Sequence, residues 1–249
     1  MIFLKETIYY IPGAPRIAVI GDFHNNDYSA IVSSLRHHRF DMICIPGDLV
    51  CATFLGRGSL LETQKNIVPL LNTCVELAPT FMSLGNHESI LMPEDQEAIQ
   101  SLGVVILDNA WVCHNNIFIG GLTSHYVLNR RAFRLTHPDE ERHVLHIMQY
   151  KDWKPIEDPD LSWLEPVPSG YTVLLSHHPE YHPKLPKVDL VLAAHAHGGQ
   201  WNIFGHGFYA PGQGYFPKWT SGLYGNMLVT RGLANTANIP RINNPMEIV

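Results

Sequence analysis

The sequence predicts a mixed α/β domain that is rich in β-sheet. Three observations lead to this fold class: short apolar runs that end in polar residues, helical patterns between the first of these runs, and a hairpin signal in the middle of the chain. Of the 249 residues, 45% are hydrophobic, which is enough to fill one large core. We therefore expect a single domain that spans residues 1–249.

Five apolar runs are predicted to be short buried strands, because each is a few residues long and is closed by polar or turn-forming residues. They cover residues 16–22, 41–48, 80–88, 171–178 and 188–197. A further stretch, 104–122, carries two or three strands, and its Asn115-Asn116 pair predicts a tight antiparallel turn.

Two helices are expected between the early strands. Residues 27–38 begin with Asp27, an N-cap candidate, and carry Ile31 and Leu35 at helical spacing. Residues 60–77 form a second, longer amphipathic stretch.

Residues 124–168 depart from this alternation of strand and helix. They contain a basic cluster, an acidic cluster, several prolines and a predicted helix at 138–150. The segment is either a lid or a solvated excursion, since structureless excursions of this length are uncommon unless they are functional.

Composition excludes some classes of function. The formal net charge of −6 argues against a general electrostatic grip on nucleic acid, so any phosphate bound here needs another source of positive charge. The four cysteines form no C-x-x-C pair, which suits a reducing compartment. Because the sequence shows neither a signal peptide nor an apolar run long enough to span a membrane, we expect a cytoplasmic location and no transmembrane segment.

Polar residues with ligand chemistry follow five of the predicted strands. In open α/β sheets, functional groups gather beyond the carboxyl ends of the strands. These ends supply Asp22, His24, Asp48, Asn86, His87, His177, His195 and His197. Most are good oxygen or nitrogen ligands for a metal ion, and although each alone is a weak signal, five strand ends of this kind point to a metal site.

At these residues the sequence resembles the calcineurin-like metallophosphoesterases. That family has ordered blocks D-x-H, G-D, G-N-H-[DE], a later His and G-H-x-H, and this chain shows "GDFH", "PGDL", "GNHE", "SHHPE" and "AHAH". The resemblance runs from about Arg16 to the C-terminus and implies a four-layer α/β/β/α sandwich with two mixed sheets. Ala194 replaces the usual glycine before the histidine pair, which would cause strain if this backbone needs a positive φ.

The resemblance also implies a dinuclear metal centre of Mn, Fe or Zn ions. One ion would take Asp22, His24 and His197, the other would take Asn86, His177 and His195, and Asp48 would bridge both. Residues one apart on an extended segment point to opposite sides, so His195 and His197 can serve two ions only if the chain turns, and Gly198-Gly199 favours such a turn. Two divalent ions, two carboxylates and a shared hydroxide leave one positive charge, which attracts phosphate. The implied nucleophile is that metal-bridging hydroxide, which attacks phosphorus in line.

His87 is left without a metal in this scheme. It resembles the family's histidine that protonates the leaving alkoxide or, together with Asn86, holds a phosphate oxygen. Glu88 is either the partner that orients His87 or a carboxylate in the first turn of a helix.

The segment 124–168 carries three arginines close together, Arg130, Arg131 and Arg134. If the segment is a lid, they would give a substrate a second contact. If it is a solvated flank, acidic neighbours would neutralise them.

The leading hypothesis is therefore a hydrolase of phosphomonoesters or phosphodiesters, acting on a small-molecule or lipid substrate. The alternatives are a scaffold that keeps the fold without turnover, and a histidine-rich metal-storage or nucleic-acid module, which the acidic charge and block order disfavour. The aromatic, glycine-rich stretch 198–225 either walls a substrate pocket or packs on the core as a hairpin, and we expect packing for most of it. Substrate identity, native metals and oligomeric state are left open by the sequence.

Overall fold

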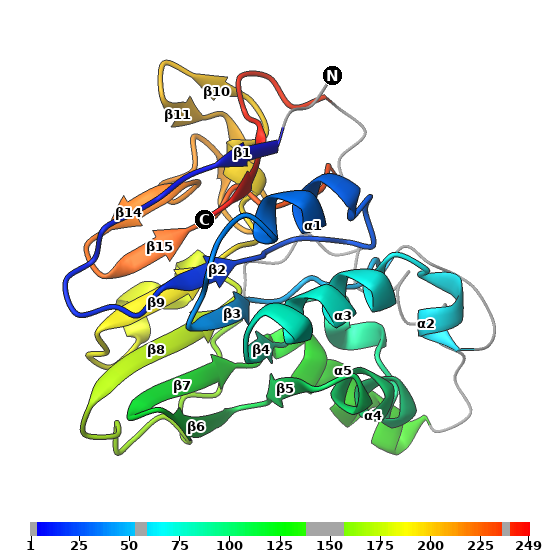
Figure 1. The fold of residues 1–249 in the computed structure, drawn as a ribbon. Coiled ribbons are helices and arrows are strands. Elements are labelled where there is room, and N and C mark those ends of the chain that lie inside the picture. The colour runs from blue at the N-terminus through cyan, green and yellow to red at the C-terminus, as the bar shows by residue number, and fades with distance from the viewer. Residues whose placement is uncertain (1–3, 53–58, 138–156, 236–239) are drawn as a thin grey trace.

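The structure is a computed structural model that describes residues 4–52, 59–137, 157–235 and 240–249. The helix predicted at 138–150 lies outside these residues, as does the middle of the predicted lid, 138–156. The described chain is an α/β protein with two main sheets (Figure 1). All five apolar runs that were predicted to be strands contain one.

The first main sheet has four strands in the order β2-β3-β4-β5. These are Ile17–Val19, Met42–Ile45, Thr80–Ser83 and Val104–Leu107, and every neighbouring pair is parallel. The second sheet has six strands in the order β14-β15-β9-β8-β7-β6. They are Gly222–Tyr224, Met227–Val229, Leu190–Ala193, Tyr171–Ser176, Ile117–Leu122 and Ala110–His114.

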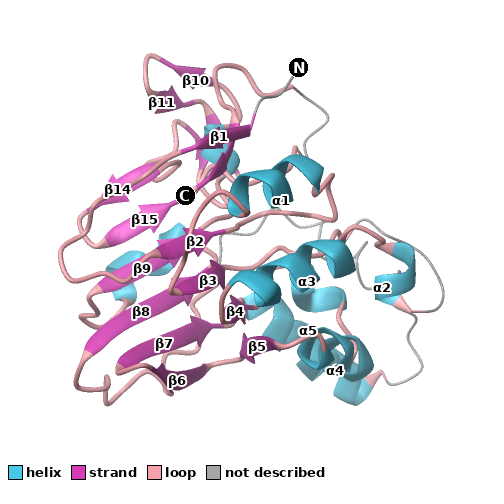
Figure 2. Cartoon of the chain, in the orientation of Figure 1, coloured by secondary structure: helices cyan, strands magenta, loops and turns pink. Residues whose placement is uncertain are grey.

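Only the six-stranded sheet is mixed, with antiparallel pairs β14–β15 and β6–β7 at its two edges. The expectation of two mixed sheets is therefore wrong for the four-stranded one. Its strands are joined by helical crossovers, which return the chain to the same end of the sheet and so make neighbours parallel. The crossovers are α1 (Ser29–Leu35), α2 (Leu60–Thr63) with α3 (Ile67–Leu77), and α4 (Pro93–Ser101), all visible in Figure 2.

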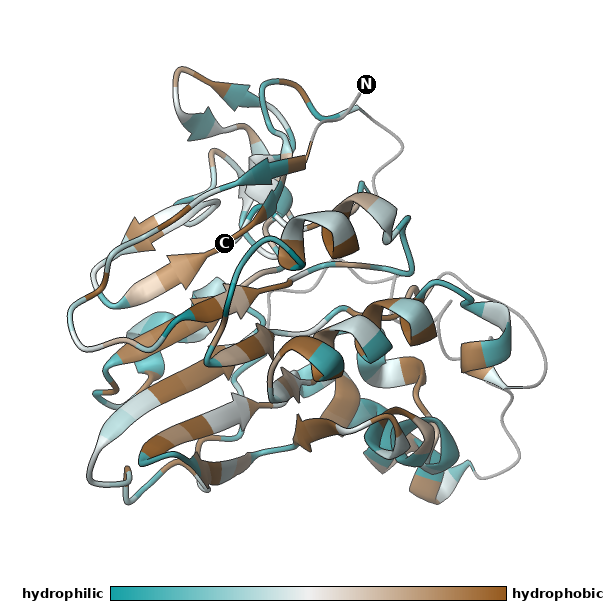
Figure 3. Cartoon of the chain, in the orientation of Figure 1, coloured by the Kyte–Doolittle hydropathy of each residue, from teal (hydrophilic) through white to brown (hydrophobic). Residues whose placement is uncertain are grey.

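The core is divided among three apolar layers, as the α/β/β/α sandwich requires. The first lies between the helices and the four-stranded sheet, where Leu70 of α3 packs with Ile43 of β3. The second lies between the sheets, where Phe81 of β4 meets Val173 of β8. The third covers the outer face of the six-stranded sheet, where Tyr181 of the 3-10 helix η2 (Pro179–Lys184) is buried. Figure 3 shows this apolar character along the strands of both sheets.

Both predicted helices are shorter than expected, because side chains bond to the backbone near their ends. Asp27 does not cap α1 directly, since the N-cap is Tyr28 and the Asp27 carboxylate accepts from the backbone and hydroxyl of Ser29. The stretch 60–77 is broken between α2 and α3. There the side chain of Gln64 accepts from the N–H and donates to the C=O of Cys51, a tertiary contact that overrides helical propensity.

The stretch 104–122 contains three strands, in agreement with the two or three that were predicted. β6 and β7 form the predicted antiparallel hairpin, and both turn residues are left-handed, Asn115 at φ 49° and Asn116 at φ 62°. β5, by contrast, pairs with β4 in the other sheet.

Smaller elements complete the fold. β1 (Leu4–Glu6) pairs in parallel with β16 (Met246–Ile248), so the two ends of the described chain lie side by side. Two short hairpins follow β9, namely β10 (Asn202–Ile203) with β11 (His206–Gly207), and β12 (Tyr209–Ala210) with β13 (Gly214–Tyr215). Helix α5 spans His125–Thr136, and the 3-10 helices η1 and η3 span His87–Ile90 and His197–Gly199. Within the described ranges, none of the helices has the length and apolar character needed to cross a membrane.

Candidate metal centre

The structure brings the eight predicted site residues together beyond the carboxyl ends of five strands. Asp22 and His24 follow β2, Asp48 follows β3, Asn86 and His87 follow β4, His177 follows β8, and His195 and His197 follow β9. All are buried except Asn86, which is half-buried. Their ligand atoms lie within 4.8 Å of one another in overlapping groups, among them Asp22 with His24 and His197, and Asp22 with Asp48 and His177.

Five of these residues have left-handed backbones. The φ angles are 49° at Asp22, 48° at His24, 54° at Asp48, 67° at His195 and 46° at His197. This conformation costs roughly 1 kcal/mol or more for each residue that is not glycine, and it persists only where the surrounding structure enforces it. The sharp turns allow residues close in sequence to aim their side chains into one site.

Ala194 does not bear the strain that its replacement of glycine suggested. It is not among the residues with positive φ, and the left-handed conformation falls on His195 instead. Its methyl group fits because Gly21 lies opposite, where an added Cβ would be only 2.8 Å from the Ala194 Cβ.

The carboxylate of Asp48 lies at the middle of the cluster. Its Oδ2 is 3.2 Å from Nε2 of His177, 3.6 Å from Nε2 of His24 and 3.9 Å from Nε2 of His87. Its Oδ1 accepts the backbone N–H of His87 at 2.9 Å. Burial alone would raise the pKa of Asp48, but the neighbouring His177 and His87 hold it well below its usual value. Asp48 is therefore an anion within reach of histidines from three strand ends.

His177 connects Asp48 to a second group of ligands. Its Nε2 is 3.0 Å from Oδ1 of Asn86 and 3.1 Å from Nδ1 of His195. Its Nδ1 lies 2.8 Å from the carbonyl oxygen of Pro46, which accepts a hydrogen bond from this nitrogen, and this contact turns Nε2 toward the cluster. Burial lowers the pKa of His177, but Asp48 outweighs it and raises the pKa to about 9. The same negative field would attract a cation, which would compete with that proton.

Asp22, His24 and His197 form the other group. Both oxygens of Asp22 are 3.1 Å from the backbone N–H of His195, and the rings of His24 and His197 stack at 5.3 Å. Burial lowers the pKa of both His24 and His197, as it does that of His195, so these imidazoles are neutral, the form that binds metal.

The residues of the cluster fit metal ions. Nε2 of His24 is buried and has no hydrogen-bond partner among the described residues, although it lies only 3.6 Å from Asp48. A buried polar atom without a partner costs about 1–3 kcal/mol, and coordination to a cation would satisfy it. Imidazole nitrogens together with carboxylate and amide oxygens suit Mn, Fe or Zn.

Glu88 holds the loop that carries Asp48. Its two carboxylate oxygens accept four backbone N–H groups, from Gly85 at 2.8 Å, Asp48 at 2.8 Å, Leu49 at 2.8 Å and Val50 at 3.2 Å. Burial, followed by the charge of Asp48, raises the pKa of Glu88 to about 7. The suggestion that Glu88 orients His87 through a ring nitrogen is replaced by this backbone role.

His87 is oriented by the backbone of a neighbouring loop. Its Nδ1 accepts the N–H of Ala52 at 2.9 Å, so the neutral ring carries its proton on Nε2. That Nε2 lies on the Asp48 side of the ring, and burial lowers the pKa of His87. A neutral ring with a proton on Nε2 can donate a hydrogen bond to a group bound beside Asp48.

The predicted arginine cluster lies on α5, which packs against η1. Arg134 donates to the carbonyls of Leu91 at 2.8 Å and Ser89 at 3.2 Å, at the end of the turn that begins with His87. Arg131 pairs with Asp108 at 2.6 Å, and Arg130 is buried. Protein groups already bind Arg131 and Arg134. A second substrate contact by these arginines stays a prediction.

The sequence did not indicate a buried polar network that lies next to His195. The ring of His178 lies 4.3 Å from that of His195, and its Nε2 is 2.7 Å from the hydroxyl of Ser124. Nearby, Nδ1 of His125 is 2.7 Å from the hydroxyl of Tyr181. The doubled histidine in "SHHPE" was a signal for His178, but its partners come from distant segments.

Arg241 is a second residue that the sequence did not indicate. It is buried, and its Nη2 lies 3.1 Å from Nδ1 of His197. Its Nη1 donates to the carbonyl of Arg231 at 2.8 Å, and burial lowers the pKa of Arg241 to about 10. It thus supports the His197 side of the cluster.

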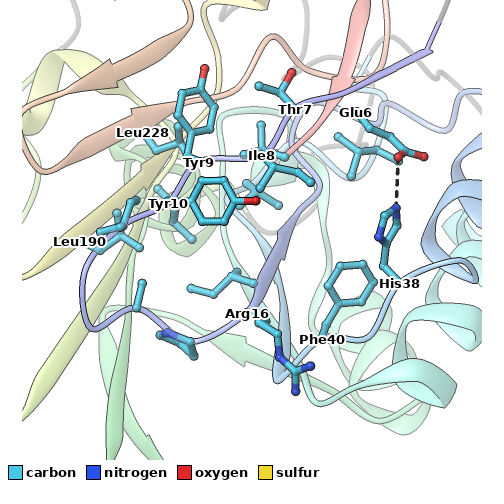
Figure 4. Close-up of a pocket in the computed structure, with 18 of the residues that line it drawn as sticks. Glu6, Thr7, Ile8, Tyr9, Tyr10, Arg16, His38, Phe40, Leu190 and Leu228 are labelled. Atoms are coloured by element: carbon cyan, nitrogen blue, oxygen red, sulfur yellow. Dashed lines mark hydrogen bonds and ion pairs between the residues drawn. The ribbon is translucent and has the colours of Figure 1, made fainter.

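A cavity of about 540 Å³ lies at the other ends of the strands (Figure 4). Its wall includes Ile17 at the start of β2 and Leu190 at the start of β9, together with Tyr9, Tyr10 and Phe40. None of the eight candidate site residues lines it. This apolar cavity is therefore separate from the candidate metal-binding side chains.

Comparison with known proteins places the site in a family context. Residues 15–199 match the sequence profile of a family described as calcineurin-like phosphoesterase. Two uncharacterized metallophosphoesterases from Helicobacter pylori are similar over 210 residues, that of strain ATCC 700392 / 26695 at 27% identity and that of strain J99 at 26%. Each alignment covers 79% of this chain and 49% of the relative, so the chain spans about half the length of these relatives. The structure of the calcineurin-like phosphoesterase YfkN from Bacillus subtilis is similar over 88% of this chain and 81% of that chain, with 12% identity and a TM-score of 0.48.

Proposed function

Because this chain belongs to the calcineurin-like phosphoesterase family, we propose that it is a phosphoester hydrolase that uses two metal ions held around Asp48. The observation that carries the proposal is the position of this carboxylate, whose Oδ2 lies between histidines from separate strand ends. A carboxylate in such a position can be shared by two cations, whose mutual repulsion it offsets.

Seven residues would hold the ions. Asp22, His24 and His197 would bind one, Asn86, His177 and His195 would bind the other, and Asp48 would bridge them. When bound, the metal pair would supply an acidified water as the nucleophile and positive charge for the phosphoryl oxygens. The left-handed turns at five of these residues support the assignment, since strained backbone gathers at functional sites.

The chain's own residues would position the ester and offset charge on the leaving oxygen. Asn86 and His87 lie at the start of η1, where they would hold a phosphoryl oxygen. His87 would donate a hydrogen bond from Nε2 to the leaving oxygen, because the Ala52 N–H occupies its other nitrogen. Glu88 would keep the Asp48 loop in place through its four backbone contacts.

Small-molecule and lipid phosphoesters both remain within the proposal, as do monoesters and diesters. A cytoplasmic location is also part of it, supported by four free cysteines. A catalytically silent scaffold is less favoured, because six candidate ligands and His87 lie in overlapping groups and the seventh ligand, Asn86, is 3.0 Å from His177.

The test is metal removal and reconstitution. Protein treated with a chelator should lose turnover of bis-p-nitrophenyl phosphate and p-nitrophenyl phosphate, and regain it with Mn²⁺, Fe²⁺ or Zn²⁺ at two ions per chain. Ca²⁺ is the matched control, since it prefers all-oxygen sites and should restore little activity. Undiminished turnover in protein shown by elemental analysis to be free of metal would contradict the proposal.

A further inference from the structure

Two aromatic hairpins stand beside the candidate metal centre. At the tip of β10–β11, Phe204 is 99% exposed and Ile203 is 49% exposed. At the open end of β12–β13, Tyr215 is 69% exposed and Phe216, which follows it, is 79% exposed. These four side chains are exceptions to the packing expected for most of this stretch.

The bases of the hairpins are firmly packed. The ring of Phe208 stacks on Trp201 at 5.5 Å and meets the edges of Tyr215 at 5.5 Å and Phe216 at 5.6 Å. The backbone N–H of Phe208 donates to the carbonyl of Gly199, two residues after the candidate ligand His197, at 2.9 Å. The exposed side chains are therefore carried by hairpins that are joined, through Phe208, to the loop that follows the candidate metal ligands.

The backbone at the two exposed phenylalanines is strained. Phe204 has a φ of 52° and Phe216 a φ of 56°, the left-handed region that bulky residues avoid. Glycine or asparagine would adopt it more easily, and either would expose less apolar surface to water. Strain and apolar exposure fall on the same two side chains, which is expected if these side chains insert into a partner.

The local charge indicates the nature of that partner. Between Leu190 and Met246 the sequence has no aspartate or glutamate, whereas all 23 acidic residues lie elsewhere. Its charged side chains are Lys218, which is exposed next to the second hairpin, and two arginines at 231 and 241. This stretch can therefore approach an anionic surface although the whole chain carries a net charge of −6.

We propose that Phe204, at the tip of the first hairpin, and Phe216, at the open end of the second, form a docking surface for an anionic lipid bilayer. Aromatic side chains favour the boundary between lipid headgroups and acyl chains, and a lysine beside them adds attraction to anionic headgroups. Docking at Phe204 and Phe216 would hold the metal centre close to the headgroups. The consequence that the substrate is a lipid-borne phosphoester rests on the proposed function, whereas the docking itself does not.

Vesicle flotation tests the docking. Wild-type protein should float with phosphatidylcholine vesicles that contain phosphatidylglycerol, and less with phosphatidylcholine alone. The double variant F204S/F216S should partition about ten-fold more weakly or worse, since each buried phenylalanine contributes strongly to insertion. The control Y10S/L135S removes two apolar side chains that are 90% and 86% exposed on other elements, and should bind like the wild type.

Several results would overturn the proposal. Wild-type protein that stays off the anionic vesicles would do so, as would equal binding by F204S/F216S. Light scattering would also overturn it if the wild type is a dimer and F204S/F216S is a monomer. Phe204 and Phe216 would then form an interface between two copies of the chain. Phe204→Trp guards against misfolding of the double variant: its emission should shift to the blue and be quenched by brominated lipid, and an unchanged spectrum counts against insertion.

The two proposals fail separately. Vesicle binding requires no turnover, so a protein that binds vesicles but hydrolyses no ester contradicts only the proposed function. F204S/F216S should keep the wild-type rate on a small water-soluble ester, because neither phenylalanine belongs to the proposed metal ligands.

Discussion

The two ends of the parallel strands are built in opposite ways. Beyond the carboxyl ends, Asp22 and Asp48 are buried among histidines and sit on left-handed turns. At the amino ends, strands β2 and β9 open onto an apolar cavity whose polar rim is exposed to water (Figure 4). There Arg16 pairs with Asp41 at 2.8 Å and His38 with Glu6 at 3.1 Å.

This contrast shows where substitution should matter. A buried charge interacts strongly with its neighbours and is costly to leave without partners, whereas an exposed pair is screened by water and contributes little. Chemically identical changes at the two ends therefore provide matched tests. The change at the metal end should reduce activity or stability far more than the same change at the cavity end.

The largest difference is expected for aspartate. Asp48→Asn removes the charge that both proposed ions share, so metal content should fall and turnover should drop about 1,000-fold or more. Asp41→Asn makes the same change in an exposed pair and should leave turnover near wild type. Elemental analysis and a chromogenic ester assay measure both effects, and two tightly bound metals with normal rates in Asp48→Asn would disprove the bridging role.

Histidine gives the second comparison. His87→Ala should retain metal but slow turnover by about 100- to 1,000-fold for esters with poor alkoxide leaving groups, because the hydrogen bond that offsets charge on the leaving oxygen is lost. An activated phenolate spreads that charge over its own ring, so its rate should suffer least. His38→Ala is the control at the cavity end and should change neither rate. A uniform loss across the series of leaving groups would instead assign His87 to phosphate binding.

Glutamate gives the third comparison. In Glu88→Gln the amide can accept through only one oxygen, so about two of the four backbone N–H groups would lose their acceptor. We expect a loss of about 2–4 kcal/mol in the free energy of unfolding. Urea denaturation measures it, with Glu6→Gln as the control. Equal stability of Glu88→Gln and wild type would mean that the Asp48 loop does not depend on this carboxylate.

Much of the metal end could be predicted because its ligands are local in sequence. Each follows an apolar strand directly, and parallel strands bring their carboxyl ends to one edge. The role of Glu88 could not be predicted, since its acceptor contacts reach residues 48–50 from about 40 positions away. The break between α2 and α3 has the same cause, a side-chain contact between Gln64 and Cys51.

The exposure of Phe204 and Phe216 could not be predicted, for a different reason. Aromatic and glycine-rich composition indicates hairpins but does not say which side chains are covered. Phe208 and Phe216 lie in the same stretch, yet Phe208 packs among three rings whereas Phe216 is mostly exposed. Exposure here depends on the turn geometry, which places Phe204 and Phe216 in left-handed conformations that sequence patterns do not predict for phenylalanine.

The smallest expected effect is the pH dependence of Glu6 at the cavity end. Its carboxylate accepts from the hydroxyl of Ser34 at 2.5 Å and lies 3.1 Å from Nε2 of His38. The hydrogen bond from Ser34, followed by that from His38, lowers the pKa of Glu6 below its usual 4.5. Since the folded pKa is the lower one, this stabilisation is present above pH 4.5 and is lost as the pH falls through the folded pKa.

The Glu6 carboxylate is almost half exposed, so solvent screening should keep its contribution below about 1 kcal/mol. Urea denaturation of wild type and Glu6→Gln should therefore differ slightly at pH 7, and the difference should shrink as the pH falls below 4.5. A gap that widens as the pH falls would have the wrong sign for a lowered pKa. A loss at pH 7 as large as that of Glu88→Gln would remove the contrast between the two ends, because an exposed rim carboxylate would then matter as much as a buried one.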